Sequence, residues 1–208
     1  MRCIGLLALL LTAPVLATTP AAGPEAVVKE TAAAMFDALD ANAAALKADP
    51  DKVQPLVERI LLPKFEVDYA ARLVLGNHWR SATPEQQQRF QTAFVRFLTR
   101  TYGRAIVSFK RDQLSFLPLR GPLDPKRTTV QTEVARASGA PIPVDYVLRQ
   151  TPDGWKVFDV VIEGISYVRN YRTSFGEEIE REGRGDPAKG LESLIKRLET
   201  AKPEAAKA

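Results

Sequence analysis

The chain has 208 residues, with 29 Lys and Arg against 25 Asp and Glu and a formal net charge of +4. This length is typical of a single domain and is sufficient to bury a sizeable apolar core. Charges of both signs are interspersed along the sequence and form no long block of one sign. That pattern argues against a nucleic-acid-binding arm and against a polybasic membrane anchor.

The N-terminus has the features of a secretory signal peptide. Met1 and Arg2 precede an apolar run that starts at Cys3, and Val15 and Ala17 have the spacing that signal peptidase reads. The apolar run is shorter than the roughly 20 residues that a membrane-spanning helix needs. We therefore predict that residues 1–17 are removed on export and that the mature protein is soluble.

Cysteine and histidine chemistry is almost absent from the sequence. Cys3 is the only cysteine and lies inside the predicted signal peptide, so the mature chain has no disulfide and no cysteine ligand for a metal. His78 is the only histidine, which excludes a histidine-based metal cluster. We expect His78 to be structural, and we predict no metal and no cofactor.

The first part of the chain is predicted to be helical. Apolar residues at steps of three and four indicate helices over 25–48 and 53–61, the second closed by Pro63. A third helix is expected over 65–75, with Gly76 as the residue that ends it.

A long helix is predicted to begin at a capping box. Thr83 can cap the helix, Pro84 suits the first helical position and Gln86 completes the box. The apolar face of this helix comprises Phe90, Ala93, Phe94, Phe97, Leu98, Tyr102 and Ile106. The side expected to face water carries Arg89, Arg96, Arg100 and Arg104.

After Lys110 the apolar residues alternate in steps of two, which is the pattern of β-strands. Strands are expected over 114–116, 130–134, 142–148 and 155–162. Short turns separate the later strands, so the pattern predicts an antiparallel meander of about four strands. By alternation, one face of the last strand carries Trp155, Val157 and Val161, and the other carries Phe158, Val160 and Ile162.

Two helices are predicted to follow the strands, one capped by Ser166 and stopped at Gly183, the other starting at Asp186. The Ala, Lys, Pro and Glu tail over 201–208 is predicted to be disordered. The order of helices, strands and helices predicts one α+β domain over 18–200. In this domain helices pack on a curved antiparallel sheet.

Two stretches of the sequence carry a family resemblance. One is residues 73–80 (LVLGNHWR), which lead into the capping box, and the other is residues 155–172 (WKVFDVVIEGISYVRNYR). The second is the more specific, because a Trp-Lys-Val-aromatic-Asp strand followed by Glu-Gly-Ile-Ser and Asn-Tyr-Arg is hard to match by chance. Together they resemble the MlaC or toluene-tolerance family of the Mla phospholipid transport system.

The resemblance implies a monomeric periplasmic carrier of glycerophospholipid. Such a carrier takes the acyl chains into an apolar pocket between sheet and helices, leaves the head group near solvent, and maintains outer-membrane lipid asymmetry. It further implies two transient partners: the hexameric lipid-binding subunit of an inner-membrane Mla ABC transporter and an outer-membrane Mla lipoprotein complex. A hopanoid-associated carrier of the same fold remains an open alternative.

The expected pocket lies between the apolar face of the long helix and the apolar face of the sheet, because both are too apolar to face water. The residues expected to contact lipid are Phe94, Leu98, Tyr102, Phe116, Val130, Val144, Tyr146, Trp155, Val157, Val161, Tyr167 and Tyr171.

Asp159 supports a rival hypothesis. By strict alternation it shares a face with Trp155, and a buried carboxylate near a tyrosine can act as the base of a small isomerase or dehydratase. A buried aspartate more often pairs with an arginine or caps a backbone group, and Arg169 and Arg172 are candidate partners. We therefore predict that the protein is not an enzyme.

Overall fold

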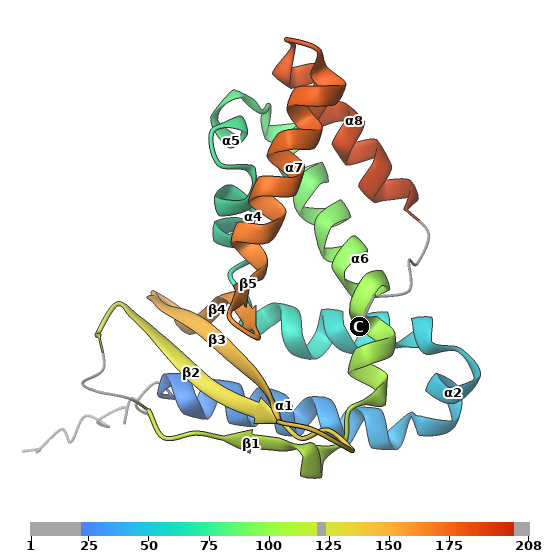
Figure 1. Ribbon diagram of the computed structural model, residues 1–208, viewed down its shortest axis with the longest axis vertical. Coiled ribbons are helices and arrows are strands. Elements are labelled where there is room, and N and C mark those ends of the chain that lie inside the picture. The colour runs from blue at the N-terminus through green and yellow to red at the C-terminus, as the bar shows by residue number, and fades with distance from the viewer. Residues whose placement is uncertain (1–21, 120–123, 202–208) are drawn as a thin grey trace, which may run out of the picture.

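The computed structural model describes residues 22–119 and 124–201. The predicted signal peptide lies outside the described residues, as does the tail beyond Ala201. Figure 1 shows a β-sheet and helix α1 (Pro24–Ala41) at one end of the long axis, with helices α7 (Tyr167–Gly183) and α8 (Pro187–Thr200) at the other. Within the described residues, none of the helices has both the length and the apolar character needed to span a membrane.

The sheet is an antiparallel meander with its strands in sequence order. The strands are β1 (Leu114–Phe116), β2 (Arg127–Val134), β3 (Ile142–Thr151), β4 (Gly154–Ile162) and β5 (Ile165–Ser166). The predicted α+β class is confirmed. The described part of the chain has a five-stranded sheet, one strand more than the sequence suggested.

The extra strand arises from a tight turn at Glu163 and Gly164. Both residues have positive φ angles, 51° and 80°, as a type I′ hairpin turn requires. The chain therefore folds back, and Ile165 pairs with Ile162. The sequence indicated that Gly164 ends a strand, whereas Gly164 also lets a two-residue strand pair with the preceding one.

A β-bulge interrupts the pairing of β3 and β4. Val147 pairs with Asp159 and Leu148 pairs with Val157, which leaves Phe158 as an extra residue on β4. An extra residue reverses the alternation of side chains on the strand beyond it. The predicted strict alternation along β4 is therefore wrong after Phe158.

The bulge changes which residues share the sheet face that packs on α1. We call this the α1 face. Its buried residues Val130, Leu148 and Val157 contact Val27 and Val28 of α1.

Beyond the bulge, the register places Val160 and Ile162 on the α1 face together with Tyr146 and Val144. Asp159 and Val161 lie on the opposite face, apart from Val157. The expectation that Asp159 and Val161 share a face with Val157 is thus corrected by the bulge.

The predicted N-terminal helices are shorter than expected. The helix expected over 25–48 is divided at Asn42 into α1 and α2 (Ala43–Ala48), and the Asn42 side chain donates a hydrogen bond to the Ala38 carbonyl oxygen at 2.7 Å. The helix expected over 53–61 is a mixture of turns. They are the 3-10 turn η1 (Pro50–Val53), α3 (Gln54–Leu56), the π turn η2 (Val57–Leu61) and the 3-10 turn η3 (Leu62–Lys64).

Helix α4 (Val67–Leu75) starts later than the sequence predicted, because the preceding residues join the sheet. Phe65 forms a parallel bridge with Val157, and the Glu66 backbone N–H donates to the Val157 carbonyl oxygen at 2.8 Å. This contact sits at the bulge, where β5 is too short to reach. A short helix α5 (His78–Ser81) follows.

The long helix is α6 (Pro84–Ser108), and its predicted capping box is confirmed. The Gln86 backbone N–H donates to Thr83 Oγ1 at 3.2 Å, and the Thr83 N–H donates to Gln86 Oε1 at 3.1 Å. The helix then runs past α8 and α4 (Figure 1). A 3-10 turn, η4 (Arg111–Gln113), leads from it into β1.

Two arginines of α6 bind α8 and do not simply face water. Arg89 forms ion pairs with Glu192 at 2.9 Å and with Glu199 at 3.0 Å, and these hydrogen bonds lower the pKa of the Glu199 carboxyl. Arg100 donates to the Leu198 carbonyl oxygen at 2.6 Å. Arg96 and Arg104 are exposed, as predicted.

Among the described residues, the buried apolar side chains form three separate clusters. The helical cluster joins α4, α6, α7 and α8 and includes Phe90, Phe94, Tyr171, Phe175, Ile179 and Leu194. The N-terminal cluster comprises Met35, Leu39, Leu46, Val53, Leu56 and Val57. The sheet cluster comprises Val27, Val28, Val130, Leu148 and Val157. A domain of this size more commonly has one contiguous core.

The backbones of helices α7 and α8 approach each other closely at Gly190. A Cβ atom added to Gly190 would overlap the carbonyl oxygen of Ile179 and would lie 3.1 Å from the Gly183 Cα. This close approach lets Leu191, Leu194 and Ile195 of α8 bury fully. The close packing of α7 against α8 therefore requires a residue without a Cβ atom at position 190.

We predict that Gly190→Ala lowers the free energy of unfolding by about 3 kcal/mol, because the methyl group forces the backbones of α7 and α8 apart. Gly176→Ala is the matched control, since a Cβ at Gly176 in α7 has open space around it. That substitution should stabilise the protein by about 0.5 to 1 kcal/mol through helix propensity. Chemical denaturation measures both changes, and equal effects would contradict the close-packing argument.

Candidate functional site

Each buried cluster has a margin of apolar side chains that are only partly buried. The helical margin comprises Trp79, Phe97, Leu98, Tyr102, Tyr167 and Val168. The N-terminal margin comprises Phe36, Ala38, Ile60, Leu61, Leu62, Ile106 and Val107. The sheet margin comprises Phe65, Phe116, Leu119, Tyr146, Trp155 and Val160. Large apolar groups at so many margins leave surface that the chain itself does not cover.

The three margins adjoin one another along the chain. Tyr102 of the helical margin and Ile106 of the N-terminal margin lie one turn apart on α6. Leu62 and Phe65, which are close in sequence, belong to the N-terminal and sheet margins. Tyr167 of the helical margin directly follows β5, which pairs with β4. Parts of the three margins are therefore neighbours along the chain, although the buried clusters themselves are separate.

The residues predicted to line a pocket fall mainly into two groups. Those in the helical cluster or its margin are Phe94, Leu98, Tyr102, Tyr167 and Tyr171. Those in the sheet cluster or its margin are Phe116, Val130, Tyr146, Trp155 and Val157. Val144 is buried on the α1 face, whereas Val161 lies on the opposite face.

Not all of these residues stand at a margin. Phe94 is buried within the helical cluster, where its ring stacks on Phe90 at 5.5 Å and meets Tyr171 and Phe175 edge-on at 5.3 and 5.7 Å. Other protein side chains therefore surround Phe94. One turn further along α6, Leu98 is at the margin.

Three tyrosines meet where α6 crosses the start of α7, and we call them the tyrosine cluster: Tyr102, Tyr167 and Tyr171. The hydroxyl groups of Tyr102 and Tyr171 are 3.0 Å apart and form a hydrogen bond. The Tyr167 ring lies 5.3 Å from the Tyr102 ring and 6.1 Å from the Tyr171 ring. Burial raises the pKa of Tyr102 and that of Tyr167 to about 12 each, so both groups stay protonated at neutral pH.

Asp159 has a structural role in this arrangement. One carboxylate oxygen accepts from Ser166 Oγ at 2.6 Å and the other from the Val168 backbone N–H at 3.0 Å. Ser166 Oγ in turn accepts from the Arg169 N–H at 3.1 Å, which confirms Ser166 as the cap of α7. Asp159 thus binds the start of α7. Of the two structural roles expected for it, contact with a backbone group is observed, and its hydrogen-bond partners in the described residues include neither the Arg169 nor the Arg172 guanidinium.

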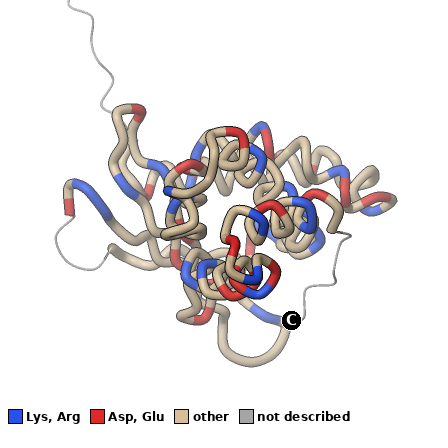
Figure 2. Tube along the Cα trace, turned by 90° about the horizontal axis from the view of Figure 1, so that it is seen from above, with Lys and Arg blue, Asp and Glu red and all other residues tan. Residues whose placement is uncertain are grey.

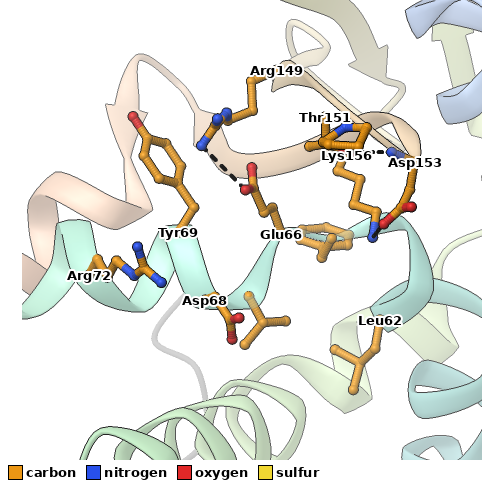
Figure 3. Close-up of a pocket in the computed structure, with 12 residues that line it drawn as sticks. Leu62, Glu66, Asp68, Tyr69, Arg72, Arg149, Thr151, Asp153 and Lys156 are labelled. Atoms are coloured by element: carbon orange, nitrogen blue, oxygen red, sulfur yellow. Dashed lines mark hydrogen bonds and ion pairs between the residues drawn. The ribbon is translucent and has the colours of Figure 1, made fainter.

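A charged cleft that the sequence did not predict lies beside α4 (Figure 3). Its volume is about 490 Å³. Residues from the start of α4 and from the hairpin between β3 and β4 line it, among them Glu66, Asp68, Tyr69, Arg72, Arg149, Asp153 and Lys156. No sequence pattern links these positions, because they come from segments about 80 residues apart.

The cleft pairs its charges internally. Arg149 donates to Glu66 Oε1 at 3.2 Å, and its guanidinium lies 4.4 Å from the centre of the Tyr69 ring. Lys156 lies 3.6 Å from Asp153. Cations and anions are balanced in the cleft, so its charge selects no single class of ligand. Figure 2 shows that residues of both signs are also interspersed along the rest of the described chain.

His78 lies in α5, beside Trp79 and Arg80, and is partly buried. Across residues 22–119 and 124–201, no group of three His, Cys, Asp or Glu side chains is placed to hold a metal ion. The partly buried apolar side chains of the three margins are therefore the candidate lipid-contacting surface.

Comparisons with known proteins agree with the predicted resemblance. The MlaC protein family matches residues 29–200. The chain is 34% identical over 180 residues to the toluene tolerance protein ttg2D of Pseudomonas putida, covering 86% of this chain and 83% of that protein. It is 26% identical over 168 residues to the intermembrane phospholipid transport system binding protein MlaC of Haemophilus influenzae, covering 79% and 77% of the two chains.

A solved structure is also similar. The phospholipid-binding protein from Ralstonia solanacearum, in complex with a phospholipid, superposes with a TM-score of 0.77 at 28% sequence identity. The superposition covers 86% of this chain and 97% of that one. The resemblance that residues 73–80 and 155–172 indicated is thereby confirmed.

We predict that Asp159→Asn lowers the free energy of unfolding by about 1 to 3 kcal/mol, because the carboxylate loses a charged hydrogen bond to the start of α7. Asp145→Asn is the control: Asp145 shares the sheet face of Asp159 and makes no side-chain hydrogen bond among the described residues. Urea unfolding followed by circular dichroism gives both values. An Asp159→Asn protein as stable as the Asp145→Asn protein would refute the capping role.

Proposed function

Since the chain belongs to the MlaC family, we propose that it is a periplasmic phospholipid carrier that shuttles glycerophospholipid between inner-membrane and outer-membrane complexes. The observation that carries this proposal is the division of the apolar core into three clusters, each bordered by large apolar side chains that are only partly buried. The bound phospholipid of the similar Ralstonia structure supports the same cargo. By shuttling lipid, the protein maintains the lipid asymmetry of the outer membrane.

The energetics favour a carrier that offers the lipid an environment similar to the bilayer. Burial is worth about 0.8 kcal/mol per CH₂ group, so an acyl chain of about 16 carbons costs on the order of 12 kcal/mol to expose to water. Apolar margins that the protein leaves open can accept such a chain in place of water. Transfer between bilayer and protein is then nearly balanced in free energy and requires no covalent step.

The proposed partners are those of the Mla system: the hexameric lipid-binding subunit of the inner-membrane ABC transporter and the outer-membrane lipoprotein complex. Charges of both signs are interspersed along the chain, and this pattern suits transient contacts with the two partners. We propose that the carrier acts as a monomer. We also propose that Asp159 stabilises the start of α7 and takes part in no catalysed reaction.

The cargo is tested by purifying the mature protein from the periplasm without added lipid. Native mass spectrometry should show the mass of a protein–lipid complex, and denaturing mass spectrometry should identify the released lipid as a glycerophospholipid. Recovery of hopanoid would assign the protein to the alternative carrier, and lipid-free protein with unchanged stability would refute the proposal. The same intact mass should show cleavage after Ala17.

Leu98→Trp separates a lipid-contacting margin from a filled core. Leu98 is partly buried at the helical margin, so the larger side chain should occupy the space of an acyl chain and displace lipid at a near-native melting temperature. Leu194→Trp is the matched control, because Leu194 is fully buried in the helical cluster. Overpacking there should cost about 1 to 3 kcal/mol.

Bound-lipid stoichiometry and melting temperature are measured for both variants. Loss of lipid only in Leu98→Trp supports the proposed site. Lipid retained by a destabilised Leu98→Trp protein would mean that Leu98 packs in a filled core.

A further inference from the structure

The tyrosine cluster brings polar groups into an otherwise apolar margin. Tyr102 and Tyr167 stand at the helical margin, and Tyr171 is buried beside them. Their neighbours in the same cluster and margin are apolar: Phe94, Phe97, Leu98 and Phe175. Acyl chains need only apolar contacts, so the gathered hydroxyl groups call for a separate explanation.

The hydroxyl groups have more hydrogen-bond donors than they use among themselves. Each phenol has one O–H donor and can also accept. The Tyr102–Tyr171 bond consumes one donor, and whichever tyrosine accepts retains its own. The Tyr167 hydroxyl lies close enough to that of Tyr102 for a hydrogen bond between them to affect the pKa of both. Three donors thus share two contacts, and one donor remains. The cluster can therefore donate to an acceptor that another molecule supplies.

The acceptor that suits this cluster is neutral. A tyrosine hydroxyl is protonated at neutral pH at its ordinary pKa, and burial raises the pKa of Tyr102 and Tyr167 further, so they donate without carrying charge. Arg197, whose guanidinium lies 5.9 Å from the centre of the Phe97 ring, is bound through two atoms to the carboxylate of Glu178 at 2.6 and 2.7 Å. A cluster of neutral donors beside apolar side chains matches ester carbonyl groups, which link acyl chains to glycerol, better than it matches a phosphate.

We propose that one hydroxyl group of the tyrosine cluster, at Tyr102 or Tyr167, donates a hydrogen bond to a glycerol ester carbonyl of the bound lipid. This inference rests on the proposed carrier function and adds a chemical selection to it. The cluster lies next to β5, where the helical margin adjoins the sheet. The carbonyl bound there fixes how far the acyl chains enter the apolar region.

The test compares two lipids that differ only at the carbonyls. The mature protein is equilibrated with vesicles holding equal amounts of a diester phosphatidylethanolamine and the dialkyl ether analogue of equal chain length. Native mass spectrometry gives the ratio of the two bound lipids. The wild-type protein should prefer the ester by about 3- to 10-fold, which is the net value of one hydrogen bond.

Tyr102→Phe and Tyr167→Phe keep the aromatic rings and remove the hydroxyl groups. Each should reduce the ester preference, and the double variant should bring the ratio close to one. Tyr69→Phe is the control, because Tyr69 lies on α4 against Phe158 and Arg149, away from the cluster. It should retain the wild-type ratio.

The outcomes distinguish this inference from the function on which it rests. A wild-type protein that binds neither lipid overturns the carrier function itself. Equal binding of both lipids by the wild-type protein, or an ester preference that survives in the double variant, overturns the role of the tyrosines and leaves the carrier function intact. If the double variant fails to fold, it binds neither lipid. The comparison of each single variant with the Tyr69→Phe control then shows whether removing a cluster hydroxyl lowers the ester preference.

Discussion

The carboxylate of Asp159 joins the sheet to the helical cluster, because its two oxygens accept from the Ser166 side chain and from the Val168 backbone. These contacts cross the β4–β5 hairpin and set the direction in which α7 leaves the sheet. Helix α7 in turn packs on α8 and α4, and α8 packs on α6, so one charged hydrogen-bonding group orients the helical cluster. The bulge at Phe158 makes these hydrogen bonds possible, since it turns Asp159 to the sheet face away from α1.

The direction of α7 has a cost in stability. Helices that stand away from the sheet leave three small clusters in place of one large core, and apolar side chains at the margins stay partly exposed. The chain compensates with dense local packing, as at Gly190, and with links such as Arg89 to Glu192 and Glu199. A protein with a continuous core would bury more of these apolar side chains and would be more stable.

Local signals in the sequence predicted the local structure well. The capping box at Thr83, the cap at Ser166 and the helix start at Asp186 each depend on residues within one turn. The meander followed from short turns between alternating strands. The family was also accessible, because residues 155–172 combine a strand, a hairpin turn and a helix cap in one continuous stretch.

The features that sequence reasoning missed are set by contacts between distant segments. Nothing in the alternation around Phe158 marks an extra residue, yet the backbone of Glu66, far away in sequence, hydrogen-bonds at that point of β4. The misplacement of Asp159 and Val161 followed from this one bulge. Phe94 and Leu98 carry the same kind of apolar signal on the same helix face, and only packing against α7 separates a buried ring from a margin residue.

Neutral hydroxyl groups suit a carrier better than charged ones. A charged hydrogen bond to a phosphate is about twice as strong as a neutral one, and a buried ion pair broken on release leaves an uncompensated charge. A protein with such a site would hold its lipid and release it slowly. The proposed bond from the tyrosine cluster to an ester carbonyl contributes about 1 kcal/mol, which is enough to position the glycerol and small beside the burial of the acyl chains. On release, the tyrosine hydroxyls can bond to one another, as Tyr102 and Tyr171 do. The lipid-free protein therefore has no unpaired charge at this site, and the free-energy difference between lipid in the proposed carrier and lipid in the bilayer stays small.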